Sequence, residues 1–97
     1  MARYISLIQF TAKGAQEIKS SPSRAKAFID AAEKAGVKVE SQFWTVGAYD
    51  GVLVLQADDA NKAPHYLAEL VAGGNVTTNT LQAFTENEFK GILGTDG

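Results

Sequence analysis

A tyrosine and an aspartate lie side by side between two glycines in the segment GAYDG, residues 47–51. An aspartate followed by a glycine is typical of a hairpin turn, and Tyr49 could simply pack on a neighbouring strand. At the mouth of a pocket, a phenol hydroxyl and a carboxylate could instead orient or deprotonate a small ligand. Turn chemistry gives no reason for the tyrosine. Both interpretations stay open, and Tyr49 and Asp50 are the first candidate ligand-binding residues.

A second group of polar side chains lies around residues 11–24, and its members are Thr11, Lys13, Lys19 and Arg24. Backbone N–H groups and cations at the start of a helix could hold a carboxylate or a phosphate there, but the pattern favours ordinary solvated lysines. The Gly-x-x-x-x-Gly-Lys pattern of a phosphate-binding loop is absent. Arg24 stands out because its planar guanidinium could pair with a carboxylate such as Asp50. Thr11 and Arg24 are kept as candidate ligand-binding residues.

The single tryptophan, Trp44, is the last candidate ligand-binding residue. It alternates with Gln42 and Val46 along a predicted strand, on the face that Phe43 does not occupy. Tryptophan is enriched in protein interfaces, so one interpretation places Trp44 in a dimer core. The other places it against a cavity between sheet and helices, where it would stack on an aromatic ligand.

Metal and cofactor chemistry find little support in the residue types. His65 is the only histidine, there are no cysteines, and His65 with Glu69 forms an i, i+4 pair that we interpret as exposed helix surface. We predict no metal and no cofactor, and we name no catalytic residue.

The elements that must position these residues follow from hydrophobic periodicity and from turn and cap signals. Regular alternation along residues 37–46 puts Val37, Val39, Ser41, Phe43 and Thr45 on one face of a strand. A helix is expected to begin at Pro22 with Ser21 as its cap and to end before Gly36, and Thr85 with Glu88 forms a capping-box pattern. The expected strands are Arg3–Phe10, Val37–Val46, Val52–Ala57 and Asn75–Phe84, and the expected helices are Pro22–Ala35, one capped by Asn61, and a short one after Thr85.

The resulting order is β-α-β-β-α-β with a short C-terminal helix, which predicts an α+β, ferredoxin-like fold. Such a fold has a four-stranded antiparallel sheet with two helices on one face. The strand VLVLQA is apolar on both of its faces, although helices would cover only one. We therefore expect the open sheet face to be packed in a homodimer or a larger homo-oligomer.

Length and charge limit the classes of protein. The 97 residues suit one domain, 1–97, with one core, and the formal net charge of −2 with interspersed signs gives no basic surface for nucleic acid. The start MARYISLIQF lacks the pattern of a signal peptide, and no apolar run approaches membrane-spanning length. We expect a cytoplasmic protein with no nucleic-acid or membrane partner.

Several segments together resemble one known family. GAYD before an aliphatic strand and GNVTTNTLQAF near the end are similar to the GYD-domain family, as are the opening YISLIQFTAKG and the helix start IKSSPSRAKAF. The resemblance covers nearly the whole chain. It implies a ferredoxin-like fold of the dimeric α/β-barrel group, found mostly in bacteria, with no established activity to carry over.

Two functional classes follow. The first is a small-molecule binding or sensing module that works as a homo-oligomer, with a mostly apolar pocket and a few polar groups at its rim. The second is a cofactor-free enzyme of the isomerase or monooxygenase type, by analogy with other dimeric α/β-barrel proteins. Few polar residues are expected to point inward, which favours binding, and whether the chain is an enzyme stays open.

Overall fold

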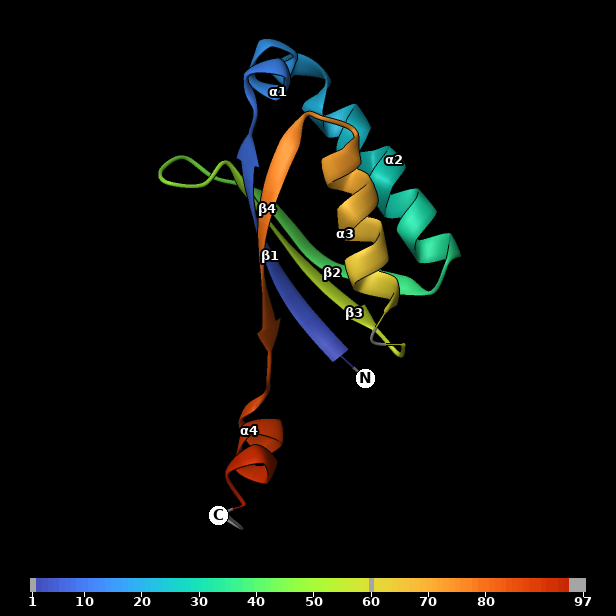
Figure 1. Cartoon of the computed structure of the whole chain (residues 1–97), viewed down its shortest axis with the longest axis vertical. Helices are drawn as coiled ribbons and strands as arrows, with labels where there is room; N and C mark the ends of the chain where they lie inside the picture. Colours follow the sequence, from blue (N-terminus) through green and yellow to red (C-terminus); the bar gives the residue numbers. More distant parts are fainter. Residues whose placement is uncertain (1, 60, 95–97) are drawn as a thin grey trace.

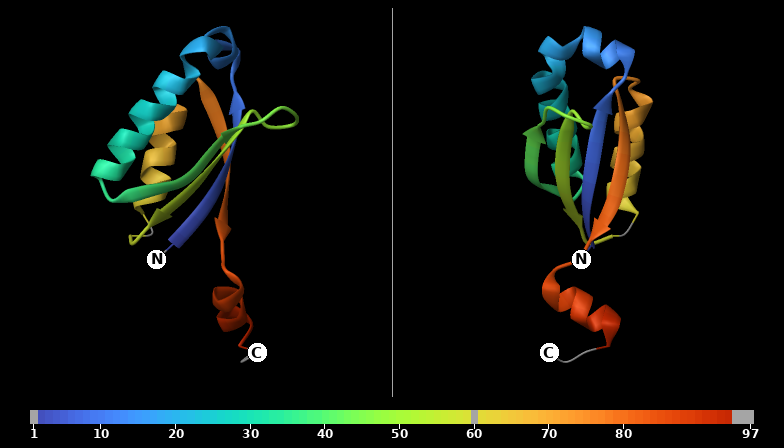
Figure 2. Two further views of the ribbon diagram at one scale, coloured as in Figure 1. Left: turned by 180° about the vertical axis from the view of Figure 1, so that it is seen from behind. Right: turned by 90° about the vertical axis from the view of Figure 1, so that its left-hand side faces the viewer.

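The computed structural model describes residues 2–59 and 61–94, and positions 1, 60 and 95–97 of the predicted domain lie outside the described residues. The elements, in chain order, are β1 (Ala2–Phe10), α1 (Ala12–Gln16), the 3-10 helix η1 (Ile18–Ser20), α2 (Ser21–Lys34), β2 (Val37–Trp44), β3 (Gly51–Ala57), α3 (Lys62–Ala72), β4 (Val76–Ala83) and α4 (Glu86–Leu93) (Figure 1). The strands form one antiparallel sheet in the order β2-β3-β1-β4. Both α2 and α3 cover the same face of it (Figure 2). This confirms the predicted α+β, ferredoxin-like fold.

The hydrophobic core lies between the sheet and these two helices. Leu55 and Val37 are fully buried there, and the small residues Ala32 and Ala63 allow α2 and α3 to approach the strands closely. The core residues are Ile8, Ala32, Val37, Leu53, Leu55, Ala57, Ala63, Leu67 and Val76. Every residue of β3 that faces the helices is buried, as expected for a central strand.

Most of the predicted helix ends are confirmed. Gly36 follows α2 with φ +91°, a left-handed conformation that glycine adopts without steric cost. Asn61 precedes α3, and Thr85 forms the capping box of α4 with Glu88. The predicted cap of α2 is wrong: the helix begins at Ser21 itself, and the Ser21 hydroxyl accepts a hydrogen bond from Trp44 instead of capping the helix.

The connection between β1 and α2 is helical over most of its length. It contains the short helices α1 and η1, which follow each other directly before α2 and are absent from the helices expected from the sequence. Thr11 caps α1 by accepting from the Gly14 N–H at 3.2 Å, and its own hydroxyl donates to Gly74 O at 2.7 Å. A Cβ at position 14 would overlap the carbonyl oxygen of Asn75. Only glycine therefore allows α1 to pack this closely on the loop before β4.

A β-bulge in β2 changes which side chains face the helices. Val39 pairs with Leu55 and Ser41 pairs with Val54, so Glu40 is the extra residue between them. One extra residue reverses the alternation, and Gln42 and Trp44 therefore lie on the same face as Val37 and Val39. The regular alternation that we predicted for residues 37–46 is wrong beyond Glu40.

The opposite sheet face has no covering element among the described residues. Cross-strand neighbours on it include Leu81 beside Ile5 and Val52 beside Phe43, and the side chains of Phe43 and Leu81 are 61% and 50% exposed. The β2–β3 hairpin projects on this side and α4 extends beyond the sheet (Figure 1). Within residues 2–59 and 61–94, no helix is both long and apolar enough to cross a membrane.

Candidate ligand-binding site

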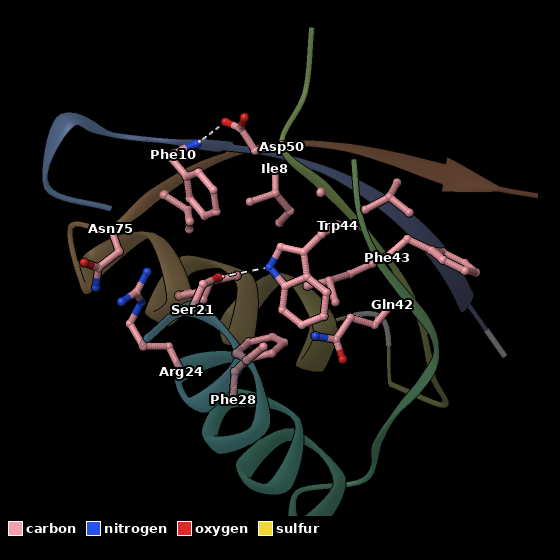
Figure 3. A pocket seen from close by; sticks show the side chains of 16 residues that line it. Ile8, Phe10, Ser21, Arg24, Phe28, Gln42, Phe43, Trp44, Asp50 and Asn75 are labelled. Atoms are coloured by element: carbon pink, nitrogen blue, oxygen red, sulfur yellow. Dashed lines mark hydrogen bonds between the residues drawn. The ribbon is translucent and has the colours of Figure 1, made fainter. Parts of the chain in front are cut away.

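A cavity of about 90 Å³ lies between α2 and the sheet. Its apolar wall includes Ile8, Phe10, Phe28, Leu53, Leu70 and Val76, and its polar groups come from Ser21, Arg24, Gln42, Trp44, Asp50 and Asn75. These residues come from α2, α3, all four strands and the loops before β3 and β4 (Figure 3). An apolar wall with few polar groups is typical of a small-molecule site.

Trp44 forms one side of the cavity. The bulge at Glu40 places its ring on the helix face of the sheet, and its indole Nε1 donates a 3.1 Å hydrogen bond to Ser21 Oγ at the start of α2. This bond fixes the ring, while the residue as a whole stays half exposed. Of the two positions that the sequence left open, the structure shows the one against the cavity. The Phe43 ring points away from it (Figure 3).

Asp50 lies at the rim of the same cavity, where the hairpin returns to the sheet. Its Oδ2 accepts a 2.7 Å hydrogen bond from the Phe10 backbone N–H, and its own N–H donates to Ile8 O at 2.7 Å. The β1–β3 pairing ends at Ile8 and Gly51. Beyond that point the Asp50 carboxylate, in place of a backbone carbonyl, accepts the hydrogen bond from the Phe10 N–H. Asp50 has a structural role in the hairpin and lines the cavity as well.

Arg24 reaches the cavity from the first turns of α2. Its Nη1 donates to Glu17 O at 3.0 Å and to Ser20 Oγ at 2.6 Å, so the guanidinium is fixed by the connection before the helix. The expected pairing of Arg24 with Asp50 is not formed, because these contacts hold the guanidinium at the α2 side and Phe10 holds the carboxylate at the strand side (Figure 3). Within the described residues, no carboxylate lies within 4.0 Å of Arg24.

Tyr49 and Thr11 do not line this cavity. The Tyr49 hydroxyl accepts a long, 3.5 Å hydrogen bond from Asn79 Nδ2, and Asn79 lies on the open sheet face opposite Leu7. Thr11 uses its hydroxyl to cap α1 and to contact the loop before β4. The structure therefore brings Arg24, Trp44 and Asp50 together and places the other two candidate ligand-binding residues elsewhere.

The remaining polar candidates are also accounted for by local contacts. Lys13 Nζ lies 3.4 Å from Gly73 O, and Lys19 is exposed. His65 Nε2 lies 3.1 Å from Glu69 Oε1, and both side chains are mostly exposed on α3. Among the described residues, no group of three His, Cys, Asp or Glu side chains is arranged to hold a metal ion.

Sequence reasoning missed Phe28, Ser21 and Asn75 as cavity residues. Phe28 lies on α2 and packs against the core, and hydrophobic periodicity alone gives no sign of a cavity beside such a residue. Asn75 follows Gly73 and Gly74 in the loop that ends α3, and its position depends on the contacts of that loop with α1. No local signal could have found it.

A model of the GYD domain matches residues 4–93. The chain belongs to the GYD-domain family. A relative from Thermus thermophilus, named glutamine synthetase and cystathionine beta-lyase binding protein, is 34% identical over 84 residues, which cover 86% of this chain and 88% of the relative. The matched region contains every residue of the cavity, so the site is part of the GYD domain itself.

Solved structures share the fold at low sequence identity. MtbAldR gives a TM-score of 0.64 at 19% identity over 88% of this chain, which spans only 52% of that protein. A protein from Thermus thermophilus gives 0.56 at 21% identity, with 88% of this chain and 95% of that chain covered. A hypothetical protein from Pyrococcus horikoshii gives 0.55 at 17% identity, with 89% and 93% covered.

Proposed function

We propose that this GYD-domain chain is a small-molecule binding module that works as a homo-oligomer. The observation that carries the proposal is the cavity between α2 and the sheet, with a wall of aliphatic and aromatic side chains and a few fixed polar groups. Arg24 and Trp44 are both held by hydrogen bonds to the start of α2 or to the connection before it. A site whose polar groups are fixed in advance loses little conformational entropy when a ligand binds.

Trp44 makes the proposal directly testable because it is the only tryptophan and it lines the cavity. A small molecule that enters the cavity should change the intensity or the emission maximum of the intrinsic tryptophan fluorescence in a saturable manner. A second reporter is Phe28→Trp in a Trp44→Phe background, which moves the tryptophan from β2 to α2 at the same cavity. If neither reporter responds to a broad panel of small organic compounds, the binding proposal fails.

The homo-oligomer part of the proposal is supported by the uncovered sheet face. Exposed apolar side chains of this size on adjacent strands are uncommon in a chain that stays monomeric. The ends of the face are flanked by the projecting hairpin and by α4, whose Phe89, Ile92 and Leu93 side chains are also at least half exposed. A second copy that packs on this face would cover these apolar groups.

A second candidate function is a protein-binding one, and the name of the Thermus thermophilus relative favours it. At 34% identity over most of both chains, an enzyme-binding surface could be shared. The test is direct binding, measured by surface plasmon resonance. This protein is tested against purified glutamine synthetase and purified cystathionine beta-lyase, both from the organism that encodes it. The absence of saturable binding to either enzyme would exclude this candidate.

Catalysis has weaker support. The enzyme alternative requires a titratable group free to act in the cavity, and the carboxylate of Asp50 already accepts the Phe10 N–H. The other charged side chain in the wall, Arg24, carries a guanidinium, which donates hydrogen bonds and does not act as a base. Binding is therefore the function that the geometry supports best.

A further inference from the structure

Two side chains that line the cavity each have one polar atom with no hydrogen-bond partner in the described structure. These atoms are Nη2 of Arg24 and Oδ1 of Asn75, and both are buried from solvent. Buried polar groups are almost always paired, because an unpaired donor or acceptor has lost its water without compensation. Two such atoms beside one cavity indicate that a bound molecule provides their hydrogen-bond partners.

Both side chains are held in place by their other atoms. Arg24 Nη1 is fixed by Glu17 O and Ser20 Oγ, and Asn75 Nδ2 lies 3.4 Å from Gly73 O. The orientation of the Asn75 amide follows from this contact, since Nδ2 can donate to a carbonyl and Oδ1 cannot. Because neither unpaired atom has a partner, they do not bond to each other, although the guanidinium points toward Asn75 (Figure 3).

The two unpaired atoms have opposite hydrogen-bonding character. Arg24 Nη2 is a donor that carries positive charge, and a carboxylate is an acceptor that pairs well with a guanidinium. The first turn of α2 also lies at the cavity through Ser21, and the positive end of its helix dipole favours a negative group there. Asn75 Oδ1 is an acceptor, and it requires a donor on the same ligand.

The size of the cavity limits the rest of the ligand. A closed cavity of about 150 Å³ holds one benzene molecule, whereas the space here is about 90 Å³ and is open on one side, so the apolar part of the ligand that it encloses must be smaller than benzene. The apolar wall formed by Phe28, Leu70 and Val76 therefore suits a short aliphatic group, with Trp44 beside it at the open side.

We infer that the cavity binds a small organic acid with a hydrogen-bond donor next to its carboxylate and a short aliphatic side chain, that is, an α-amino or α-hydroxy acid. The carboxylate accepts from Arg24 Nη2, the α-ammonium or α-hydroxyl donates to Asn75 Oδ1, and the side chain lies against the apolar wall. This assignment rests on the proposed binding function and names the ligand class of the same site.

A set of four matched compounds tests the assignment through Trp44 fluorescence, with isothermal titration calorimetry as a second readout. L-Valine and α-hydroxyisovalerate carry both groups, isovalerate lacks the donor, and isobutylamine lacks the carboxylate. For a ligand of so few atoms we expect a Kd on the order of 1 mM for at least one of the first two. Isovalerate should bind more weakly and isobutylamine should not bind.

Variants separate the assignment from nonspecific effects. Arg24→Gln should weaken the binding of the preferred acid about ten- to a hundred-fold, because it removes a charged hydrogen bond. Lys26→Gln is the control, since it removes the same charge from an exposed position of α2 that does not line the cavity. Circular dichroism and the midpoint of thermal unfolding show whether each variant is folded.

Asn75→Asp provides a test that does not depend on deleting Arg24. It places a carboxylate of the chain itself next to the guanidinium, so we expect it to compete with the ligand carboxylate and to abolish acid binding while the protein stays folded. If Asn75→Asp binds the acid as tightly as the wild type does, the assignment is overturned.

The failure of this inference can be told apart from the failure of the proposed function. If isobutanol or another small apolar compound without a carboxylate changes Trp44 fluorescence and none of the acids does, the cavity binds small molecules of another class and only the assignment is wrong. If no compound changes it, both the assignment and the binding function are wrong.

Discussion

At the scale of single residues, Asp50 shows how a motif can have two roles. The pair Asp50-Gly51 has the composition of a turn, yet the Asp50 carboxylate does more than shape the hairpin, because it satisfies the last backbone donor of β1 at Phe10. Tyr49, which turn chemistry left unexplained, faces the open sheet surface and reaches Asn79. Two neighbouring residues that looked like a single site therefore serve opposite faces of the sheet.

The contact between Asp50 and Phe10 leads to a stability prediction. Asp50→Ala would leave the partly buried Phe10 N–H without a partner, which should lower the free energy of unfolding by about 1 to 3 kcal/mol. Asp50→Asn keeps an acceptor oxygen and should lose less. Urea unfolding followed by circular dichroism measures both. Equal stability of the alanine variant and the wild type would show that the hydrogen bond contributes nothing.

Side chains on regular elements were predictable from the sequence, and those that depend on irregular geometry were not. The buried positions of β3 and the capping box of α4 follow from local patterns. The position of Trp44 could not be decided, since it depends on one extra residue at Glu40, and a bulge has no reliable signal in a single sequence. Asn75 depends on contacts between segments about 60 residues apart, such as that of Thr11 with Gly74.

At the scale of elements, the fit of α1 against the loop before β4 positions part of the cavity. This loop carries Asn75, and its backbone is bonded to Thr11 through two hydrogen bonds, Thr11 N to Asn75 O at 3.0 Å and Thr11 Oγ1 to Gly74 O at 2.7 Å. Through Thr11, the short helix α1 thus holds the loop that carries Asn75 in place beside the cavity.

A glycine substitution tests the fit of α1. Gly14→Ala would force its Cβ against the carbonyl oxygen of Asn75, and we expect the free energy of unfolding to fall by about 1 to 3 kcal/mol. Gly91→Ala is the matched control, because position 91 lies in α4 with open space around it. It should be neutral or stabilising by up to about 1 kcal/mol. Equal effects of the two substitutions, measured by urea unfolding, would contradict the close contact.

The capping box of α4 predicts a pH dependence. A hydrogen bond from the Thr85 backbone N–H, together with one that involves the Thr85 side chain, lowers the pKa of Glu88 in the folded protein. The stabilisation of α4 by ionised Glu88 is therefore present at neutral pH and is lost as the pH falls below about 4. Amide chemical shifts of α4 measured against pH should show this loss. The variant Glu88→Gln cannot titrate, and an identical transition in that variant would assign the change to another group.

At the scale of the whole molecule, the chain is elongated, with extents of 50 × 31 × 18 Å. The C-terminal helix lies beyond the sheet and contributes to this length (Figure 2). An exposed apolar sheet face, together with a projecting helix whose Phe89, Ile92 and Leu93 are exposed, is a poor arrangement for an isolated chain. The same features suit a chain that associates with a second copy.

The association prediction concerns Leu81, which lies opposite Ile5 on the open sheet face. We expect the wild type to be at least a dimer at micromolar concentration, and Leu81→Glu to raise its dissociation constant at least about ten-fold by placing a charge in the interface. Ala31→Glu adds the same charge at an exposed position of α2 and should have no effect. Analytical ultracentrifugation measures all three proteins, and a monomeric wild type would refute the association.

The central claim, that the cavity between α2 and the sheet binds a small molecule, is tested most directly by ¹H–¹⁵N correlation spectra. L-Valine and α-hydroxyisovalerate are titrated into the labelled protein, and the single indole N–H of Trp44 is followed together with the backbone amides. We predict saturable shifts of the Trp44 indole and of the amides of Arg24, Asn75 and Val76, which all line the cavity. Shifts confined to the open sheet face, around Leu7 and Leu81, or no shifts at all, would contradict the account.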